Sequence, residues 1–222
     1  SNLARRRLIK TFNEKKIKFS VASISYKKKI EGAFNQYDDY NKALKKSDAD
    51  IVYLSLPNSM HFKWGKKALI NGYHLLVDKP ITTKSGELKK LIKIANKNQL
   101  LISEAIFFNY HNQFNYIKKF CGNIKDIEQI FVNFTIPMPN KSSLLSSVKL
   151  GGGALMDMGP YAASILRIFF KDSSSNCICS FAEFIDPSLR GTKTIESILA
   201  LSAYSHKKIN SFSRSLFHKL NF

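Results

Sequence analysis

The stretch His74-Leu75-Leu76-Val77-Asp78-Lys79-Pro80 decides how the rest of the chain is organised. From His74 to Val77 it is a short apolar run, too brief for a helix, and Pro80 lacks the N–H that a strand ladder needs. Lys79 is therefore expected at the carboxyl end of a buried strand. In an open parallel sheet, ligands bind at that edge, and an enclosed lysine there can exchange protons. A solvated cation is the plainer interpretation of the same lysine.

Similar strand and helix patterns flank this stretch. Residues 50–56 are almost continuously apolar, and they precede a helix that Asn58 or Ser59 can cap and that Gly72 ends. Another helix begins near Ser85 and presents Leu88, Leu91, Ile92 and Ala95 on one face, and 100–104 reads as a further strand. Three such units in succession predict an α/β fold with a Rossmann-like parallel sheet, in which 50–56 is a central strand.

The N-terminal part lacks one feature of a doubly wound nucleotide domain. Helical spacing at 3–12 is followed by a strand at 19–25, by a charged helix at 27–34, and by a helix at 39–46 that Asp38 or Asp39 can cap. The sequence contains no Gly-x-Gly-x-x-Gly turn. We expect either that the true N-terminus lies upstream, or that the first strand and its phosphate loop have been lost.

The second half of the sequence has a different pattern. Residues 107–121 are aromatic and end as a helix, and 130–136 alternate as a long half-buried strand. A polar loop at 137–149 and a glycine run then precede an apolar helix, and strand-like runs follow at 177–184, 194–204 and 209–217. This pattern predicts an α+β domain with a mainly antiparallel sheet, incomplete at its C-terminus. We expect a dinucleotide-binding domain over 1–122 and a substrate or oligomerisation domain over 123–222.

Composition limits the classes of partner. The chain of 222 residues has a formal net charge of +19, but its lysines are scattered through nearly every expected helix. This favours a composition bias over a nucleic-acid site. Three cysteines without a paired framework favour a reduced, cytoplasmic setting, and no histidine pair has metal-ligand spacing. No window reaches the ~18 consecutive apolar residues of a membrane span.

Four stretches together resemble one known family. The chain is similar to the Gfo/Idh/MocA family of NAD(P)-dependent oxidoreductases, named after glucose-fructose oxidoreductase and inositol dehydrogenase. The likeness covers nearly the whole chain, and the order and spacing of the stretches make it specific. They are Leu56-Pro57-Asn58-Ser59-Met60-His61, Asp78-Lys79-Pro80, Glu104-Ala105 with Tyr110-His111 beyond, and Gly151-Gly152-Gly153-Ala154-Leu155-Met156-Asp157-Met158-Gly159-Pro160-Tyr161.

The resemblance implies roles for several residues. Lys79 would touch both substrate and nicotinamide, and Asp78 stands where relatives carry a glutamate one methylene longer. Tyr161 stands where many relatives place a catalytic histidine, as in the branch that resembles dihydrodiol dehydrogenases and sugar ketoreductases, and Asp157 shares its helix face. The residues implied to line the dinucleotide are Ser23, Leu56, Pro57, Asn58, His61, Asp78 and Lys79.

The implied chemistry suits these residue types. When a hydride moves between nicotinamide and a carbinol or ketone carbon, a proton must move at the oxygen, and a phenol beside an ammonium can exchange it. Each residue also has a plainer interpretation. Tyr161 alone would be a core aromatic, Asp157 a partner of the helix dipole, and His61 is equally compatible with packing at a helix start. His111 lacks the arginine and proline that flank it in relatives.

The resemblance leads to a functional hypothesis with two rivals. We expect an enzyme that oxidises or reduces a sugar or cyclic polyol with NAD or NADP, and that forms a homo-oligomer through the C-terminal sheet. Ile24 stands where NADP-selecting relatives often carry arginine, which favours NAD, although Lys27 to Lys29 could substitute. The first rival is a truncated, catalytically inactive member that serves as a binding or assembly subunit. The second is polyanion binding through the basic surface.

Overall fold

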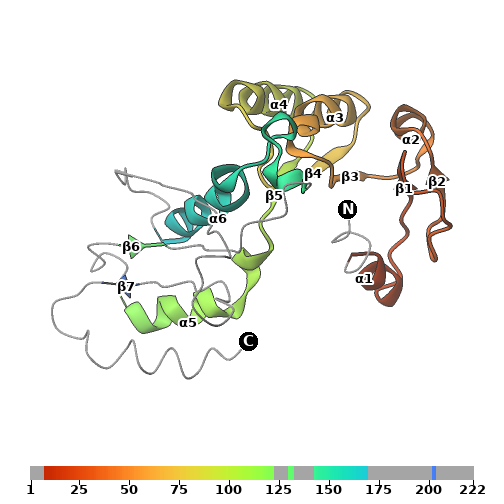
Figure 1. Ribbon diagram of the computed structural model, residues 1–222. Coiled ribbons are helices and arrows are strands. Elements are labelled where there is room, and N and C mark those ends of the chain that lie inside the picture. Colours follow the sequence, from red (N-terminus) through yellow and green to blue (C-terminus); the bar gives the residue numbers. More distant parts are fainter. Residues whose placement is uncertain (1–7, 123–129, 133–142, 170–201, 204–222) are drawn as a thin grey trace. The chain divides into compact units, whose positions relative to one another are not determined.

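The computed structural model describes residues 8–122, 130–132, 143–169 and 202–203. It divides into two compact units, which are described separately. The first unit extends to Ala105 and also contains Leu144–Gly152. The second unit contains Ile106–Ser143 and the chain from Gly153 onward. Figure 1 labels the elements of both.

A three-stranded parallel sheet forms the centre of the first unit. The strands β3 (Ile51–Leu54), β4 (His74–Asp78) and β5 (Ile102–Ala105) pair in that order. The predicted parallel α/β sheet is thus confirmed. The prediction that 50–56 form a central strand is wrong for the described residues, because β3 is an edge strand of this sheet and β4 is the middle one. The exposed side chain of Ile51 agrees with an edge position.

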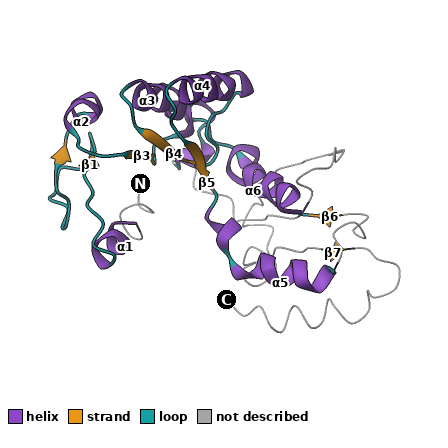
Figure 2. Cartoon of the chain, turned by 180° about the vertical axis from the view of Figure 1, so that it is seen from behind, coloured by secondary structure: helices purple, strands orange, loops and turns teal. Residues whose placement is uncertain are grey.

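The helices α3 (Asn58–Ile70) and α4 (Ser85–Lys97) cover the same face of this sheet, as Figures 1 and 2 both show. Gly72 follows α3 with a φ of +86°, in agreement with its predicted role as a helix stop. On α4, Leu91 and Ala95 are fully buried, but Ile92, which was predicted to lie on the same apolar face, is 40% exposed. The core consists of Leu54, Trp64, Ala68, Leu69, Tyr73, Leu75, Val77, Leu91 and Ala95.

The N-terminal part of the first unit contains α1 (Ile9–Glu14), β1 (Val21–Ala22), β2 (Gln36–Tyr37) and α2 (Tyr40–Lys46). The strands β1 and β2 form a separate parallel pair. The prediction of a helix at 27–34 is wrong, since this segment consists of bends and turns. The side chain of Gln36 accepts from the Ile30 amide and donates to the Lys28 carbonyl, and Gly32 has a φ of +79°. These local contacts replace the helical ones.

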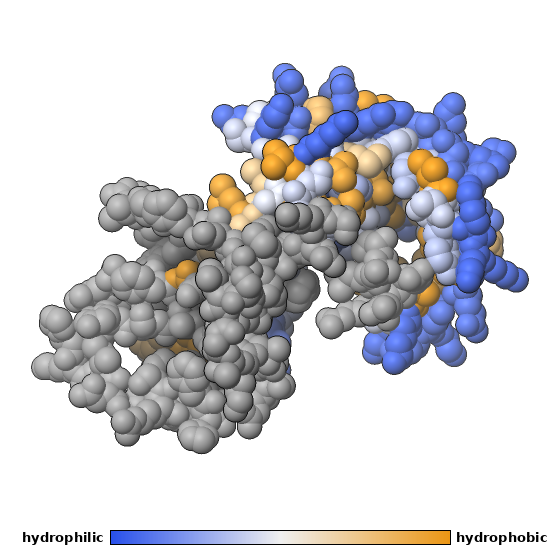
Figure 3. Space-filling view, viewed as in Figure 1, coloured by the Kyte–Doolittle hydropathy of each residue, from blue (hydrophilic) through white to orange (hydrophobic). Residues whose placement is uncertain are grey.

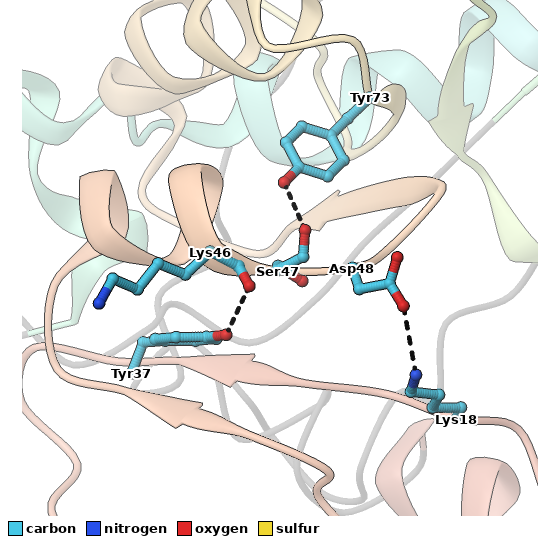
Figure 4. Close-up of polar contacts among 6 residues, drawn as sticks. All are labelled: Lys18, Tyr37, Lys46, Ser47, Asp48 and Tyr73. Carbon is cyan, nitrogen blue, oxygen red and sulfur yellow. Dashed lines mark hydrogen bonds and ion pairs between the residues drawn. The ribbon is translucent and has the colours of Figure 1, made fainter.

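The segment that follows α2 is held from several sides. The phenol of Tyr73 donates to the carbonyl of Ser47 at 3.0 Å, and that of Tyr37 donates to the carbonyl of Lys46 at 3.2 Å, as Figure 4 shows. An exposed ion pair between Lys18 and Asp48 spans 3.5 Å. These contacts fix the approach of the chain to β3.

The second unit contains one long apolar helix and a short antiparallel pair. Its described elements are η2 (Phe107–Tyr110), α5 (Asn112–Cys121), β6 (Ile130–Phe131), α6 (Ala154–Phe169) and β7 (Ser202–Ala203). The predicted helices are present, and β6 pairs antiparallel with β7. Most of the strands predicted at 130–136 and 194–204, and all of those at 177–184 and 209–217, lie outside the described residues.

The described surface is largely hydrophilic in Figure 3, where polar side chains follow the outer rim and apolar ones lie between them. The apolar side chains are spread over several elements instead of being gathered over one. Among the described residues, no helix is both long and apolar enough to cross a membrane.

Candidate active site at the carboxyl edge of the parallel sheet

Three motif segments meet at one edge of the first unit because parallel strands all end on the same side. The turn that begins at Leu56 follows β3, Lys79 follows β4, and Glu104 lies near the end of β5. In the register, Leu54 is paired with Val77, and Val77 is paired with Glu104. This carboxyl edge is where an open α/β sheet binds its ligands.

The carboxylate of Asp78 is bound by two hydroxyl groups, one from β3 and one from the residue directly after it. Ser55 donates to Oδ2 at 2.7 Å, and Tyr53 donates to Oδ1. Burial, and then the hydrogen bond to Asp78, raise the pKa of Tyr53 far above the ordinary value of a tyrosine. Tyr53 therefore stays a neutral donor. Through these two hydrogen bonds Asp78 links the end of β4 to the end of β3.

His61 joins the turn after β3 to the turn after β4. Its ring is fully buried, and its Nε2 lies 2.8 Å from the carbonyl oxygen of Leu56. Its Nδ1 lies 2.8 Å from the carbonyl oxygen of Pro80. Both contacts are complete hydrogen bonds only when both ring nitrogens carry a proton. In this position His61 holds the backbone of the two turns at the carboxyl edge. That His61 contacts a cofactor stays a prediction.

A third contact fixes the chain just beyond Lys79. The carboxylate of Glu104 accepts from the amide of Ile81 at 3.0 Å. The side chain of residue 78, the carbonyl of residue 80 and the amide of residue 81 are thus held by β3, α3 and β5 respectively. Lys79 is half-buried between these fixed neighbours. Such a backbone presents the ammonium group from a rigid base.

The turn after β3 differs in detail from the expected one. Pro57, instead of Asn58 or Ser59, is the N-cap residue of α3, and its carbonyl accepts from the Met60 amide at 2.8 Å. The side chain of Asn58 is engaged elsewhere, since its Nδ2 donates to the carbonyl of Gly151 at 2.8 Å. Leu56, Pro57 and Asn58 are all half-buried at the edge.

Ser23 lies directly after β1, at the carboxyl end of the separate two-stranded sheet. Its hydroxyl accepts from the Tyr26 amide at 3.0 Å and shapes the turn that was expected to contact the cofactor. Ile24, beside it, is 52% exposed.

Asp157 and Tyr161 belong to the second unit. They are one turn apart on α6, so they share one face of the helix, and both are half-buried. The amide of Asp157 donates to the Gly153 carbonyl at 3.0 Å, and the Tyr161 carbonyl accepts from the Ser164 hydroxyl at 2.8 Å. The predicted roles of both side chains stay predictions.

Two further kinds of residue bear on the chemistry of this chain, namely the possible metal ligands and the cysteines. Within the described ranges, no cluster of His, Cys, Asp or Glu could hold a metal ion. Burial raises the pKa of the Cys121 thiol, which disfavours the reactive thiolate. Cys177 and Cys179 lie outside the described residues.

The hydroxyl donors to Asp78 were missed in the sequence, although a signal for them exists. Tyr53 and Ser55 alternate with the buried Leu54, so they point to the opposite sheet face. Asp78 alternates in the same way with the buried Val77. Aligning the alternation of buried and outward side chains in the two neighbouring strands could have placed Tyr53, Ser55 and Asp78 on the same sheet face.

Comparison with known proteins agrees with this arrangement. Residues 7–106 match the model of the Gfo/Idh/MocA family, an oxidoreductase family with an NAD-binding Rossmann fold. Residues 7–106 belong to the NAD-binding domain of this family. The predicted recognition is confirmed, and the relatives include sugar ketoreductases and dihydrodiol dehydrogenases, as the motifs indicated.

Three relatives define the extent of the match. The dTDP-3,4-didehydro-2,6-dideoxy-alpha-D-glucose 3-reductase of Saccharopolyspora spinosa is 33% identical over 59% of this chain and 40% of its own length. The trans-1,2-dihydrobenzene-1,2-diol dehydrogenase of Xenopus laevis is 25% identical over 78% and 51%. The solved structure of KijD10, a 3-ketoreductase from Actinomadura kijaniata in complex with NADP and TDP-benzene, shares 26% identity over 77% and 55%, with a TM-score of 0.67. The chain thus spans about half the length of these relatives.

Proposed function

We propose that this chain is part of an NAD(P)-dependent oxidoreductase that transfers a hydride between nicotinamide and a carbinol or ketone carbon of a sugar or cyclic polyol. The observation that carries the proposal is the position of Lys79. It lies at the carboxyl edge of the sheet, and the residues around it are fixed by β3, α3 and β5. The sugar reductases among the relatives support the choice of substrate class.

The groups at the edge suit a dinucleotide. Both carboxylates nearby, Asp78 and Glu104, are engaged by hydrogen-bond donors. Lys79 adds a positive charge, and the first turn of α3 adds backbone N–H groups. The printed sequence has no Gly-x-Gly-x-x-Gly turn for the pyrophosphate, so the fit concerns the nicotinamide side of the dinucleotide.

In this proposal Lys79 and Tyr161 handle the proton. The cofactor would supply or accept the hydride, which is chemistry that no side chain provides. Tyr161 gives a proton to the substrate oxygen during reduction and takes it back during oxidation. The ammonium of Lys79 stabilises the phenolate and so eases both directions. Asp157 orients the substrate by accepting a hydrogen bond from one of its hydroxyl groups.

Cofactor preference, compartment and assembly are further parts of the proposal. Ser23 and the half-buried turn from Leu56 to Asn58 would line the dinucleotide, and residues 1–122 would form its domain. Residues 123–222 would bind substrate and form a homo-oligomer in the cytoplasm, with no nucleic-acid or membrane partner. Either NAD or NADP fits, and the NADP held by the solved ketoreductase gives no support to the preference for NAD inferred from Ile24.

Turnover measurements test this assignment. Oxidation of NADH and NADPH is followed in the presence of a panel of keto sugars, first with the parent protein and then with Lys79→Met and Tyr161→Phe. Loss of one general acid–base group should lower kcat by about 10²–10⁴-fold. Full turnover in both variants of an active parent would contradict the assigned roles.

An inactive binding or assembly subunit is the second candidate. It is favoured if Ser1 and Phe222 are the biological termini, because backbone amides at a glycine-rich turn normally hold the pyrophosphate. An intact mass of the native product equal to that of the printed residues, with no NAD(P)H binding, would select this candidate.

A further inference from the structure

A short segment of the chain folds on the first unit although its neighbours on both sides belong to the second. This segment, Leu144–Gly152, is called the clasp here. It consists of two single-turn 3₁₀ helices, η4 (Leu144–Ser146) and η5 (Val148–Leu150), that lie against each other. η5 also lies against α3. The clasp is therefore a docked element of the first unit.

Gly151 is the point at which the clasp meets α3. Its carbonyl accepts the hydrogen bond from Asn58 Nδ2 at 2.8 Å, and its φ is +79°. A Cβ at this position would lie 2.8 Å from the Cβ of Asn58, 3.0 Å from Cγ2 of Thr83 and 3.1 Å from the amide nitrogen of Ser59. Both the backbone angle and the close approach therefore require glycine.

Gly152 closes the clasp on itself. Its amide donates to the Ser147 carbonyl at 2.9 Å. A Cβ here would lie 2.6 Å from the Leu144 carbonyl oxygen and would also collide with the carbonyl of Leu145. The first two glycines of the run thus serve the clasp, and α6 begins only at Ala154. The glycine run was expected simply to precede that helix.

We propose that Asn58 and Gly151 form a fixed point that anchors the clasp on the first turn of α3 and thereby sets where the chain enters α6. Asn58 is then a positioning residue for Asp157 and Tyr161, which follow Gly151 in the chain on the first turns of that helix. The effect on Asp157 and Tyr161 rests on the proposed function. The anchoring itself does not.

Limited trypsin digestion tests the anchoring. Lys149 is exposed within η5, so cleavage after it reports how often the clasp leaves α3. In Asn58→Ala, loss of one hydrogen bond of about 1 kcal/mol should raise this cleavage about 5-fold. Gly151→Ala should raise it further. Cleavage at other lysines should be unchanged.

Asn98→Ala is the matched control, because Asn98 Nδ2 also donates to a backbone carbonyl of α3, that of Leu69, at 3.1 Å but away from the clasp. It should leave the cleavage after Lys149 at the parent rate. If Gly151→Ala yields no folded protein by circular dichroism, Asn58→Ala decides the test. Cleavage after Lys149 at the parent rate in Asn58→Ala would overturn the proposal.

The positioning effect has its own readout. If Asn58 acts through α6, Asn58→Ala should lower kcat at least 10-fold, in addition to any rise in the KM for NAD(P)H that comes from its place in the turn proposed to line the dinucleotide. A rise in KM with kcat unchanged would overturn the positioning role. Failure of the proposed function is distinguishable, because the parent would then bind no NAD(P)H, whereas the trypsin result for the clasp would still stand.

Discussion

Ser55 donates its hydroxyl to Oδ2 of Asp78 at 2.7 Å, from the position directly after β3, the strand beside the one carrying Asp78. Ser55 follows Leu54, and Asp78 follows Val77, the register partner of Leu54. The two side chains therefore lie opposite each other at the end of the ladder. This bond, with that from Tyr53, fixes the residue just before Lys79.

Tyr53→Phe should destabilise the protein by about 1–2 kcal/mol, since hydrogen bonds to charged groups contribute about 1.5–3 kcal/mol and this one is only half-buried. Urea denaturation measures the free energy of unfolding. Tyr37→Phe is the matched control. Its hydroxyl donates to the neutral Lys46 carbonyl at 3.2 Å in an exposed position, and its removal should cost less than about 0.5 kcal/mol. Equal losses in the two variants would contradict the special role of Asp78.

Stability should fall in alkali, partly through Tyr53. Burial and the bond to Asp78 raise its pKa above the ordinary value of 10.0. At a pH between 10.0 and the raised pKa of Tyr53, the native protein keeps the proton that the unfolded chain loses. The native state then binds more protons, so the free energy of unfolding decreases as pH rises above about 10. Tyr73, whose pKa burial also raises, should contribute in the same direction.

Denaturation of parent and Tyr53→Phe at about pH 9 and about pH 11 separates this contribution, since tyrosine titrates near pH 10. The variant should lose less stability than the parent across this interval. Identical losses would mean that Tyr53 titrates alike in both states.

His61→Leu should be severely destabilising, by about 2–5 kcal/mol, because it leaves the part-buried carbonyls of Leu56 and Pro80 without a hydrogen-bond partner at this side chain. Hydrogen exchange of the amides around residues 56 and 80 should accelerate more than that of α4. His74→Leu is the control. His74 Nδ1 accepts from the exposed Leu101 amide at 3.0 Å, and we expect a loss below about 1 kcal/mol. A uniform, small effect of His61→Leu would rule out its bridging role.

Helix capping gives a prediction at the other end of the first unit. Asp39 is the N-cap residue of α2, and its Oδ1 accepts from the Lys42 amide at 2.7 Å. Asp39→Ala should cost about 1 kcal/mol in thermal or chemical unfolding. Asp38→Ala, the exposed neighbour, should cost less than about 0.5 kcal/mol. The reverse order would mean that the cap is assigned to the wrong residue.

The sequence predicted the parallel sheet and its edge because apolar runs, helix stops and Pro80 are local signals. It missed local contacts at 27–34, where the lysine-rich segment has helix-forming residues but Gln36 and Gly32 hold it in turns. It also failed where distant residues decide. Asn58 is a good N-cap by type, yet its side chain contacts Gly151, a residue far along the chain. His61 was placed against a cofactor by resemblance, and its two carbonyl partners depend on tertiary structure.

Binding of the dinucleotide at the carboxyl edge is the central claim, and nuclear magnetic resonance titration of the ¹⁵N-labelled protein with NADPH and NADH tests it most directly. We predict that the amide signals of Leu56, Asn58 and Lys79 shift together and saturate, and that Lys79→Met weakens binding. Saturating shifts confined to other parts of the protein, or no shift with either dinucleotide, would contradict the account.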